Sequence, residues 1–163
     1  KVLIQKSGGA IELFKDAETW GISGNDTLVI RQDKIDNLLN TVLSVSRETV
    51  VSENPDNWSK YSVDDSTGMH LALIDIENNT IAYYVFGRSK SDYSHNYIRL
   101  HDNDSVYLTD QNILHHLNTE DTFWGEVPQG DEEIVPGPGM QLPPDLIEKS
   151  DTIRAESNPD DNE

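Results

Sequence analysis

A short stretch near the middle of the chain, residues 88 to 99, concentrates side chains that could do chemistry. It combines cationic, phenolic and imidazole groups at Arg88, Lys90, Tyr93, His95, Tyr97 and Arg99. Guanidinium and ammonium groups attract anions, while phenol and imidazole groups hydrogen-bond small ligands, and imidazole binds metal ions. This region is therefore the candidate ligand or partner surface.

The same stretch lacks the pattern of a phosphate-binding loop. Such a loop needs several glycines that lead into the N-terminus of a helix, where aligned N–H groups bind the anion. Here a single glycine, Gly87, ends one strand pattern, and Tyr97 begins the next. The sequence predicts that residues 88 to 96 form a solvated connection between two strands.

The other polar groups form no recognisable catalytic or metal-binding pattern. His115 and His116 are adjacent and would point about 100° apart on a helix, so they could not easily share one metal ion. Asp64 and Asp65 lie in a polar segment that fits an Asx turn. The chain has no cysteine, which excludes a thiol nucleophile and thiolate zinc ligands. We predict no enzymatic activity, no cofactor and no metal.

Charge and composition divide the chain into two regions. Its 163 residues suffice for one domain, and its formal net charge is −18. Six of the seven prolines and half of the net charge fall after about residue 125, where no aromatic residue occurs. A segment this polar cannot bury enough apolar area to offset the entropy of ordering. We predict a folded domain at 1–124 and an acidic, proline-rich flexible tail at 125–163.

The same charge bounds the partners and the cellular location. A strongly acidic chain is a poor ligand for nucleic acid and for anionic lipid, which both require clustered cations. No apolar run is long enough to span a membrane. The chain opens with Lys1 instead of a methionine and enters a strand pattern at once. We expect that a preceding signal or membrane anchor belongs to the native protein.

Hydrophobic periodicity predicts the elements that position these groups. Alternating residues around Gly8-Gly9 predict a β-hairpin over 1–15, and residues 19–23 predict a third strand. Further strands are expected at 47–53, and hairpins at 69–87 and 97–110. The connection at 88–96 would make the last four strands a continuous meander.

Helical periodicity is strongest at about 32–45, where apolar residues follow the i, i+3, i+4, i+7 spacing of an amphipathic helix. Two short helices are expected at 54–61, which opens with Asn54 and Pro55, and at 111–118. The predicted fold class is α+β, a mainly antiparallel sheet with these three helices packed on it. One sheet-and-helix interface would bury Trp20, Leu38, Leu39, Val42, Leu73, Ile74, Val85 and Leu100.

The order of these segments resembles a known family. The segments that carry the resemblance are "IELFKDAETWGIS", "DKIDNLLNTVLSVS", "RETVVSENPDNWSKYSVD", "HLALIDIENNTIAYYVFGR", "NYIRLHDNDSVYLTD" and "ILHHL". Together they cover about residues 10 to 120 and are similar to the domain-of-unknown-function 4340 family. Many relatives continue into a further αβ segment, whereas this chain enters its acidic segment after Trp124.

The resemblance implies a cellular setting but no catalytic residues. Members of the family are typically bacterial or archaeal envelope proteins with an N-terminal anchor, and many accompany ABC-transporter components of the gliding-motility type. We therefore expect a non-enzymatic accessory or interaction domain on the periplasmic or cell-surface side of the membrane, with protein partners in the envelope. One alternative is a small-ligand or metal-binding module built on residues 88–101. Another is a hydrolase without a recognisable motif.

Overall fold

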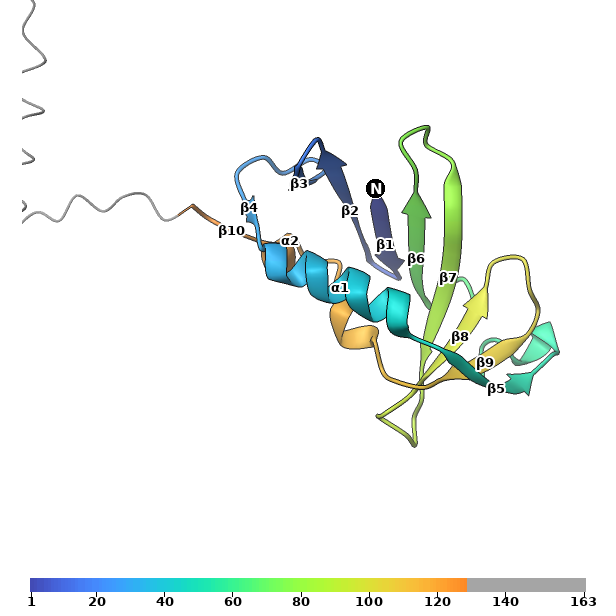
Figure 1. The fold of residues 1–163 in the computed structure, drawn as a ribbon. Helices are drawn as coiled ribbons and strands as arrows, with labels where there is room; N and C mark the ends of the chain where they lie inside the picture. Colours follow the sequence, from blue (N-terminus) through green and yellow to red (C-terminus); the bar gives the residue numbers. More distant parts are fainter. Residues whose placement is uncertain (129–163) are drawn as a thin grey trace, which may run out of the picture. The chain divides into compact units, whose positions relative to one another are not determined.

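The computed structural model describes residues 1–128, and residues 129–163, which include most of the predicted tail, lie outside this part. Eight strands form one antiparallel sheet in the order β3-β2-β1-β6-β7-β8-β9-β5, shown in Figure 1. The strands are β1 (Val2–Lys6), β2 (Gly9–Asp16), β3 (Thr19–Ile22), β5 (Arg47–Ser52), β6 (Met69–Ile74), β7 (Thr80–Arg88), β8 (Asn96–Leu100) and β9 (Val106–Thr109). The short strands β4 (Val29–Ile30) and β10 (Gly125–Glu126) pair with each other.

Local turn signals form the hairpins that the sequence predicts. Gly8 has φ 89 in the turn between β1 and β2, a conformation that glycine adopts without strain. In the turn between β6 and β7, the carboxylate of Asp75 accepts the backbone N–H groups of Glu77 and Asn79. Strands β7, β8 and β9 continue as an antiparallel meander. The three predicted hairpins are confirmed.

The amphipathic helix predicted at about 32–45 is also confirmed. Helix α1 (Gln32–Ser44) buries Ile35 and Leu38 against the sheet. Its N-terminus has no side-chain cap, but the backbone N–H of Arg31 donates to the carbonyl of Trp124 at 2.8 Å. Packing of the apolar stripe, rather than capping, therefore fixes the position of α1.

The predicted α+β class is wrong, because the described chain is nearly all β. The two short helices expected at 54–61 and 111–118 are single 3₁₀ turns, η1 (Pro55–Asn57) and η2 (Leu114–His116). A further helix, α2 (Asp121–Trp124), has only one turn. Helix α1 is the only helix longer than one turn among residues 1–128.

Local hydrogen bonds explain why the two short helices do not propagate. After η1, Ser62 adopts φ 56, and the N–H of Val63 turns back to the carbonyl of Trp58. Before η2, the N–H of Ile113 donates to the side chain of Asn96. A backbone carbonyl in the first case and a side-chain oxygen in the second accept N–H groups that could otherwise make helical bonds, and each segment has only one turn.

The chain path places a different segment on each face of the sheet. From the β3 edge, α1 crosses one face to reach β5 at the opposite edge, as Figure 1 shows. Residues 53–68 then return over the other face to the central strand β6. We call these the helix-covered face and the opposite face.

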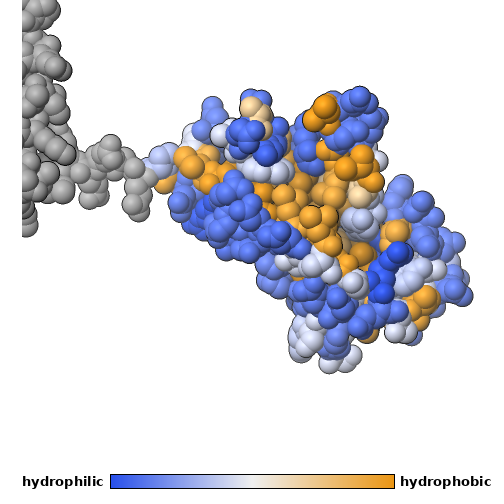
Figure 2. Space-filling view, in the orientation of Figure 1, coloured by the Kyte–Doolittle hydropathy of each residue, from blue (hydrophilic) through white to orange (hydrophobic). Residues whose placement is uncertain are grey.

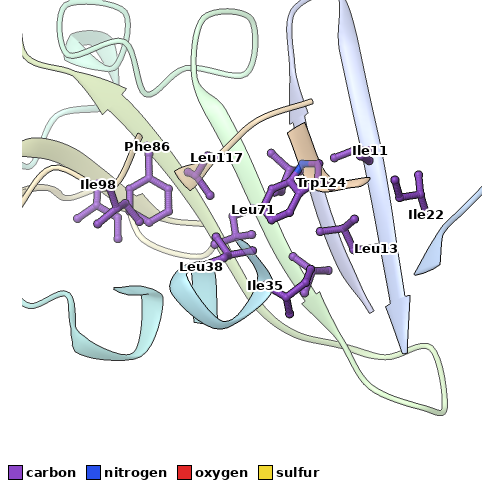
Figure 3. Close-up of a cluster of buried hydrophobic side chains, with 13 residues drawn as sticks. Ile11, Leu13, Ile22, Ile35, Leu38, Leu71, Phe86, Ile98, Leu117 and Trp124 are labelled. Carbon is purple, nitrogen blue, oxygen red and sulfur yellow. The ribbon is translucent and has the colours of Figure 1, made fainter. Parts of the chain in front are cut away.

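The larger apolar core lies on the helix-covered face, as Figure 3 shows. Trp124 is fully buried there, and its indole N–H donates to the carbonyl of Asn118 at 2.9 Å. The buried members of this core are Val2, Ile4, Ile11, Leu13, Ile22, Ile35, Leu38, Leu71, Phe86, Ile98, Ile113, Leu117 and Trp124.

A smaller core on the opposite face contains Val63, Val85 and Val106. Gly87 is required there, because a Cβ on this residue would lie 2.0 Å from the carbonyl oxygen of Tyr61. The prediction of one common interface is therefore wrong for Val85, which belongs to the second core. Of the other residues expected in the core, Leu38 is buried, whereas most are half-buried.

Candidate functional site

The six residues predicted as a ligand surface are divided among the end of strand β7, the loop that follows it and strand β8. Tyr97 and Arg99 project from the opposite face, where Tyr97 packs edge-on against Tyr61 and Arg99 pairs across the sheet with Val85. Arg88, Tyr93 and His95 line a hollow beside η2. Tyr93 and His95 lie in the loop before β8, whereas Tyr97 and Arg99 project from the strand itself, so the six side chains do not form one site.

The hollow beside η2 has a volume of about 300 Å³. It is lined by Arg88, Ser89, Tyr93, His95, Asn112, Leu114 and His115. Lys90 is exposed in the loop and is not part of this lining. The structure thus brings together three of the six predicted residues.

A hydrogen-bonded turn holds His95 at the edge of this hollow. The backbone N–H of Ser94 and the imidazole of His95 both contact the carboxylate of Asp92. These two contacts, led by the Ser94 N–H, lower the pKa of Asp92 below its ordinary value. Asp92 is thereby kept ionised next to His95, and it orients the imidazole ring.

Arg99 is occupied by contacts that hold residues 53–68 on the opposite face. Its Nε donates to the carbonyl of Val63 at 3.0 Å, and its Nη2 lies 3.1 Å from the carboxylate of Asp65. The guanidinium lies 3.9 Å from the centre of the Trp58 ring. Since Arg99 is only 3% exposed, its charge is used for this internal contact.

His70 and Tyr83 continue the polar cluster around Arg99. The Nε2 of His70 lies 3.2 Å from the carbonyl of Asp65, and its Nδ1 lies 2.8 Å from the Tyr83 hydroxyl. A carbonyl only accepts hydrogen bonds, so Nε2 carries the proton, and Nδ1 of a neutral imidazole accepts from the hydroxyl. Burial, followed by the charge of Asp65, raises the pKa of Tyr83. A phenol with a raised pKa stays protonated, as this hydrogen bond requires.

The helix-covered face carries an apolar trough beside α1. Leu39 and Val42 are half-buried, while Leu43 is 81% exposed. Leu39 and Leu43 are four residues apart and share one flank of the helix. We define the apolar trough by three residues of α1 and three of the sheet: Leu39, Val42, Leu43, Leu73, Tyr84 and Leu100.

The trough is open because one helix is too narrow to cover eight strands. A hollow of about 140 Å³ lies between the C-terminal end of α1 and strands β7 and β8. Figure 2 shows apolar surface that extends from α1 towards the β6–β7 hairpin. Ile76 and Ile81 near the tip of this hairpin are 100% and 66% exposed. Contiguous apolar surface of this kind is typical of interaction sites.

Sequence reasoning missed the trough although one signal was present. The apolar stripe of α1 includes Leu39 and Leu43 as well as the buried residues Ile35 and Leu38. The stripe is therefore wider than the part of the helix that is buried. A stripe that is wider than the buried strip leaves a flank exposed. The width of the stripe was therefore the signal that could have found this surface.

The described histidines and carboxylates do not form a metal centre. Within residues 1–128, no group of three or more His, Asp or Glu side chains could hold a metal ion. The rings of His115 and His116 lie 3.9 Å apart. Burial, with smaller contributions from His115 and Lys34, lowers the pKa of His116.

The architecture defines the chain as an antiparallel β-sheet domain with one crossing helix and an apolar trough beside it. A family model described as Domain of unknown function (DUF4340) matches residues 20–126. The chain belongs to this family. The match runs from β3 to β10, so β1 and β2 lie before it, although β1 pairs with the central strand β6. No curated protein and no solved structure matches the chain.

Within residues 1–128, no helix is long and apolar enough to cross a membrane.

Proposed function

We propose that this chain is a non-enzymatic interaction domain that binds a protein partner through the apolar trough. One observation carries the proposal: Leu43 is 81% exposed, although Leu39 on the same flank of α1 packs against the core of the helix-covered face. Exposing a leucine costs about 1.5 to 3 kcal/mol relative to full burial. A partner that covers Leu43 and its neighbours would recover that free energy on binding.

The chemistry of the trough favours a protein over other partners. Aliphatic side chains line both of its walls, and Tyr84 adds an aromatic ring with a polar hydroxyl. Clustered apolar and aromatic groups with a polar rim are typical of the centre of protein interfaces. The net charge of −18 opposes binding to nucleic acid and to anionic lipid.

The proposal includes a location and a class of partner. The resemblance noted above implies an extracytoplasmic domain that accompanies transporter components, and we propose that the partner is an envelope membrane protein. The trough supports the binding of a protein without identifying which one. The experiment therefore has to report both the contact and the identity of the partner.

Photocrosslinking at defined positions tests this proposal in cells that produce the protein. A benzophenone amino acid is placed at Leu43 or at Tyr84, which face the trough from α1 and from β7. The matched control is Asn37, which is exposed on the other flank of the same helix. We expect the same protein adduct from both trough positions and none from Asn37.

The adduct decides each part of the proposal. An envelope membrane protein in the adduct would support the partner class, whereas a cytoplasmic protein would contradict the location. An adduct with a second copy of this chain would show self-association instead of partner binding. Absence of any adduct at both trough positions, or an equal adduct at Asn37, would contradict the role of the trough.

A further inference from the structure

Two cations from distant parts of the sequence line one hollow at the end of the sheet. Lys6 ends strand β1, and Arg88 ends strand β7. Both line a hollow of about 330 Å³ that is separate from the apolar trough. Its volume is that of a small-molecule site.

The register of the sheet explains why these two side chains meet. Gln5 pairs with His70, so the next pair in the same register is Lys6 with Met69, and Met69 pairs with Phe86. Lys6 and Arg88 therefore project from the same face across three strands. With about 4.8 Å between strands and about 3.4 Å per residue, their Cα atoms lie about 12 Å apart. Both side chains are long enough to approach one anion between them.

The lining of the hollow combines polar donors with an apolar floor. Ser62 contributes a hydroxyl to the lining, whereas the hydroxyl of Thr67 donates to the carboxylate of Asp64, and Met69 and Phe86 contribute apolar surface. Hydroxyl and cationic groups donate hydrogen bonds to anions, whereas a thioether and an aromatic ring contact apolar groups. The lining therefore suits an anion that also carries a short apolar group.

Neither cation forms an ion pair with a carboxylate of residues 1–128. The ion pairs within residues 1–128 use Lys1, Arg31, His95 and Arg99 as their cations. Neither Lys6 nor Arg88 is among them, although the chain has 30 acidic residues against 12 basic ones. Two cations that line one hollow and pair with no carboxylate within residues 1–128 leave their hydrogen-bond donors available to an external anion.

We propose that the hollow lined by Lys6 and Arg88 binds a small organic anion, a phosphate monoester or carboxylate with a short apolar group. Lys6 and Arg88 bind the charged group, and Met69 and Phe86 contact the apolar group. The hollow beside η2 shares Arg88 with this site. Tyr93 and His95 therefore lie on the far side of Arg88 from the bound anion. The site does not depend on the binding of a protein at the trough.

Phenyl phosphate is a suitable probe, because it carries both chemical features. NMR titration of the isotopically labelled full chain would follow the amide signals of Gly68 and Phe86. Inorganic phosphate lacks the apolar group, and phenol lacks the charge. We expect saturable shifts with phenyl phosphate and an affinity at least about tenfold higher than for either control, because the two kinds of contact contribute together.

Variants that replace the two cations by neutral side chains test whether Lys6 and Arg88 bind the anion. The double variant Lys6→Gln, Arg88→Gln should lower the affinity for phenyl phosphate at least about tenfold. The matched control is Lys15→Gln, Lys60→Gln, which removes the same charge from exposed positions outside the hollow. Lys6→Arg should retain binding, because it keeps the charge.

Three results would overturn the proposal. The first is the absence of saturable shifts up to about 10 mM phenyl phosphate. The second is an equal loss of affinity in the control variant, which would show a general charge effect. The third is equal affinity for phenol and phenyl phosphate, which would show that the cations do not take part. Thermal unfolding of each variant would confirm that the fold is retained.

Discussion

The two faces of the central sheet are closed by different means. On the helix-covered face, α1 and the segment that ends in Trp124 bury a large apolar core. On the opposite face, residues 53–68 lie over a core of three valines and are held by the polar contacts of Arg99 and His70. One face thus depends mainly on apolar area, and the other on directed hydrogen bonds.

The comparison shows why the apolar face is the one left open. Hydrogen bonds and ion pairs have fixed partners, and within residues 1–128 every buried side-chain nitrogen or oxygen has one. Apolar contacts are not limited to fixed partners, because burying further apolar surface adds further stabilisation. The trough beside α1 is the part of the helix-covered face to which a partner can add.

The strongest test of the helix-covered face is Trp124→Ala. Because the indole is fully buried, we expect a loss of about 3 to 5 kcal/mol in the free energy of unfolding, measured by chemical denaturation. The neighbouring Phe123 is half-buried, and Phe123→Ala should cost clearly less. Equal effects of the two substitutions would show that Trp124 does not anchor this core.

The corresponding test of the opposite face is Arg99→Met. This substitution preserves much of the side-chain volume, but it leaves the carbonyl of Val63 without its donor and removes the cation from the Trp58 ring. We expect a loss of about 2 to 3 kcal/mol in the free energy of unfolding. Arg47→Met is the control, because Arg47 is exposed and its guanidinium lies over the ring of Tyr107 in β9. A loss no larger than that of the control would mean that polar contacts do not hold this face.

Substitutions in and beside the trough should distinguish side chains that stabilise the fold from side chains that bind a partner. Leu38 is buried and Leu39 is half-buried, so Leu38→Ala should cost about 2 to 5 kcal/mol and Leu39→Ala about 1 kcal/mol. Leu43→Asp should cost no more than about 1 kcal/mol in the free energy of unfolding, because this side chain is exposed and the cost is that of a carboxylate in the last turn of α1. The same variant should lose the adduct formed from a crosslinker at Tyr84. A strongly destabilised Leu43→Asp would show that Leu43 belongs to the core.

Local elements of this fold could be predicted from the sequence, and long-range pairing could not. The turn at Gly8-Gly9 and the stripe of α1 are encoded within a few residues. The pairing of β1 with β6 joins segments more than 60 residues apart, and no local signal specifies it. The run "IAYYVFG" is apolar on both faces, so its pattern could not assign Val85 to the opposite face.

The same distinction between local signals and long-range pairing applies to the candidate sites. The alternation of β8 was visible in the sequence and could have placed Tyr97 and Arg99 on one face. The meeting of Lys6 with Arg88 depends on the order of three strands and leaves no pattern in the sequence. Predicted features of the chain beyond residue 128, including the flexible tail, lie outside the described residues.

The last expected effect is a pH-dependent contribution from Asp64, where residues 53–68 approach β6. Burial opposes ionisation of this carboxylate, but hydrogen bonds from Ser66 and Thr67 outweigh it and hold the pKa of Asp64 well below its ordinary value. A lowered pKa in the folded state stabilises the fold at pH values above the ordinary pKa of about 3.9. This contribution is lost as the pH falls through the lower folded-state value.

Asp64→Asn removes the charge but keeps one acceptor oxygen, so its cost at pH 7 should be about 1 kcal/mol. Thermal unfolding at pH 7, 4 and 2.5 should show the difference between the original chain and the variant shrinking as the pH falls. Asp26→Asn, at an exposed loop position, serves as the control for loss of charge. A difference that stayed constant with pH would mean that the neutral hydrogen bonds, and not the ionised carboxylate, close this turn. Ionised groups would then contribute less to the stability of the opposite face than the ion pair of Arg99 with Asp65 indicates.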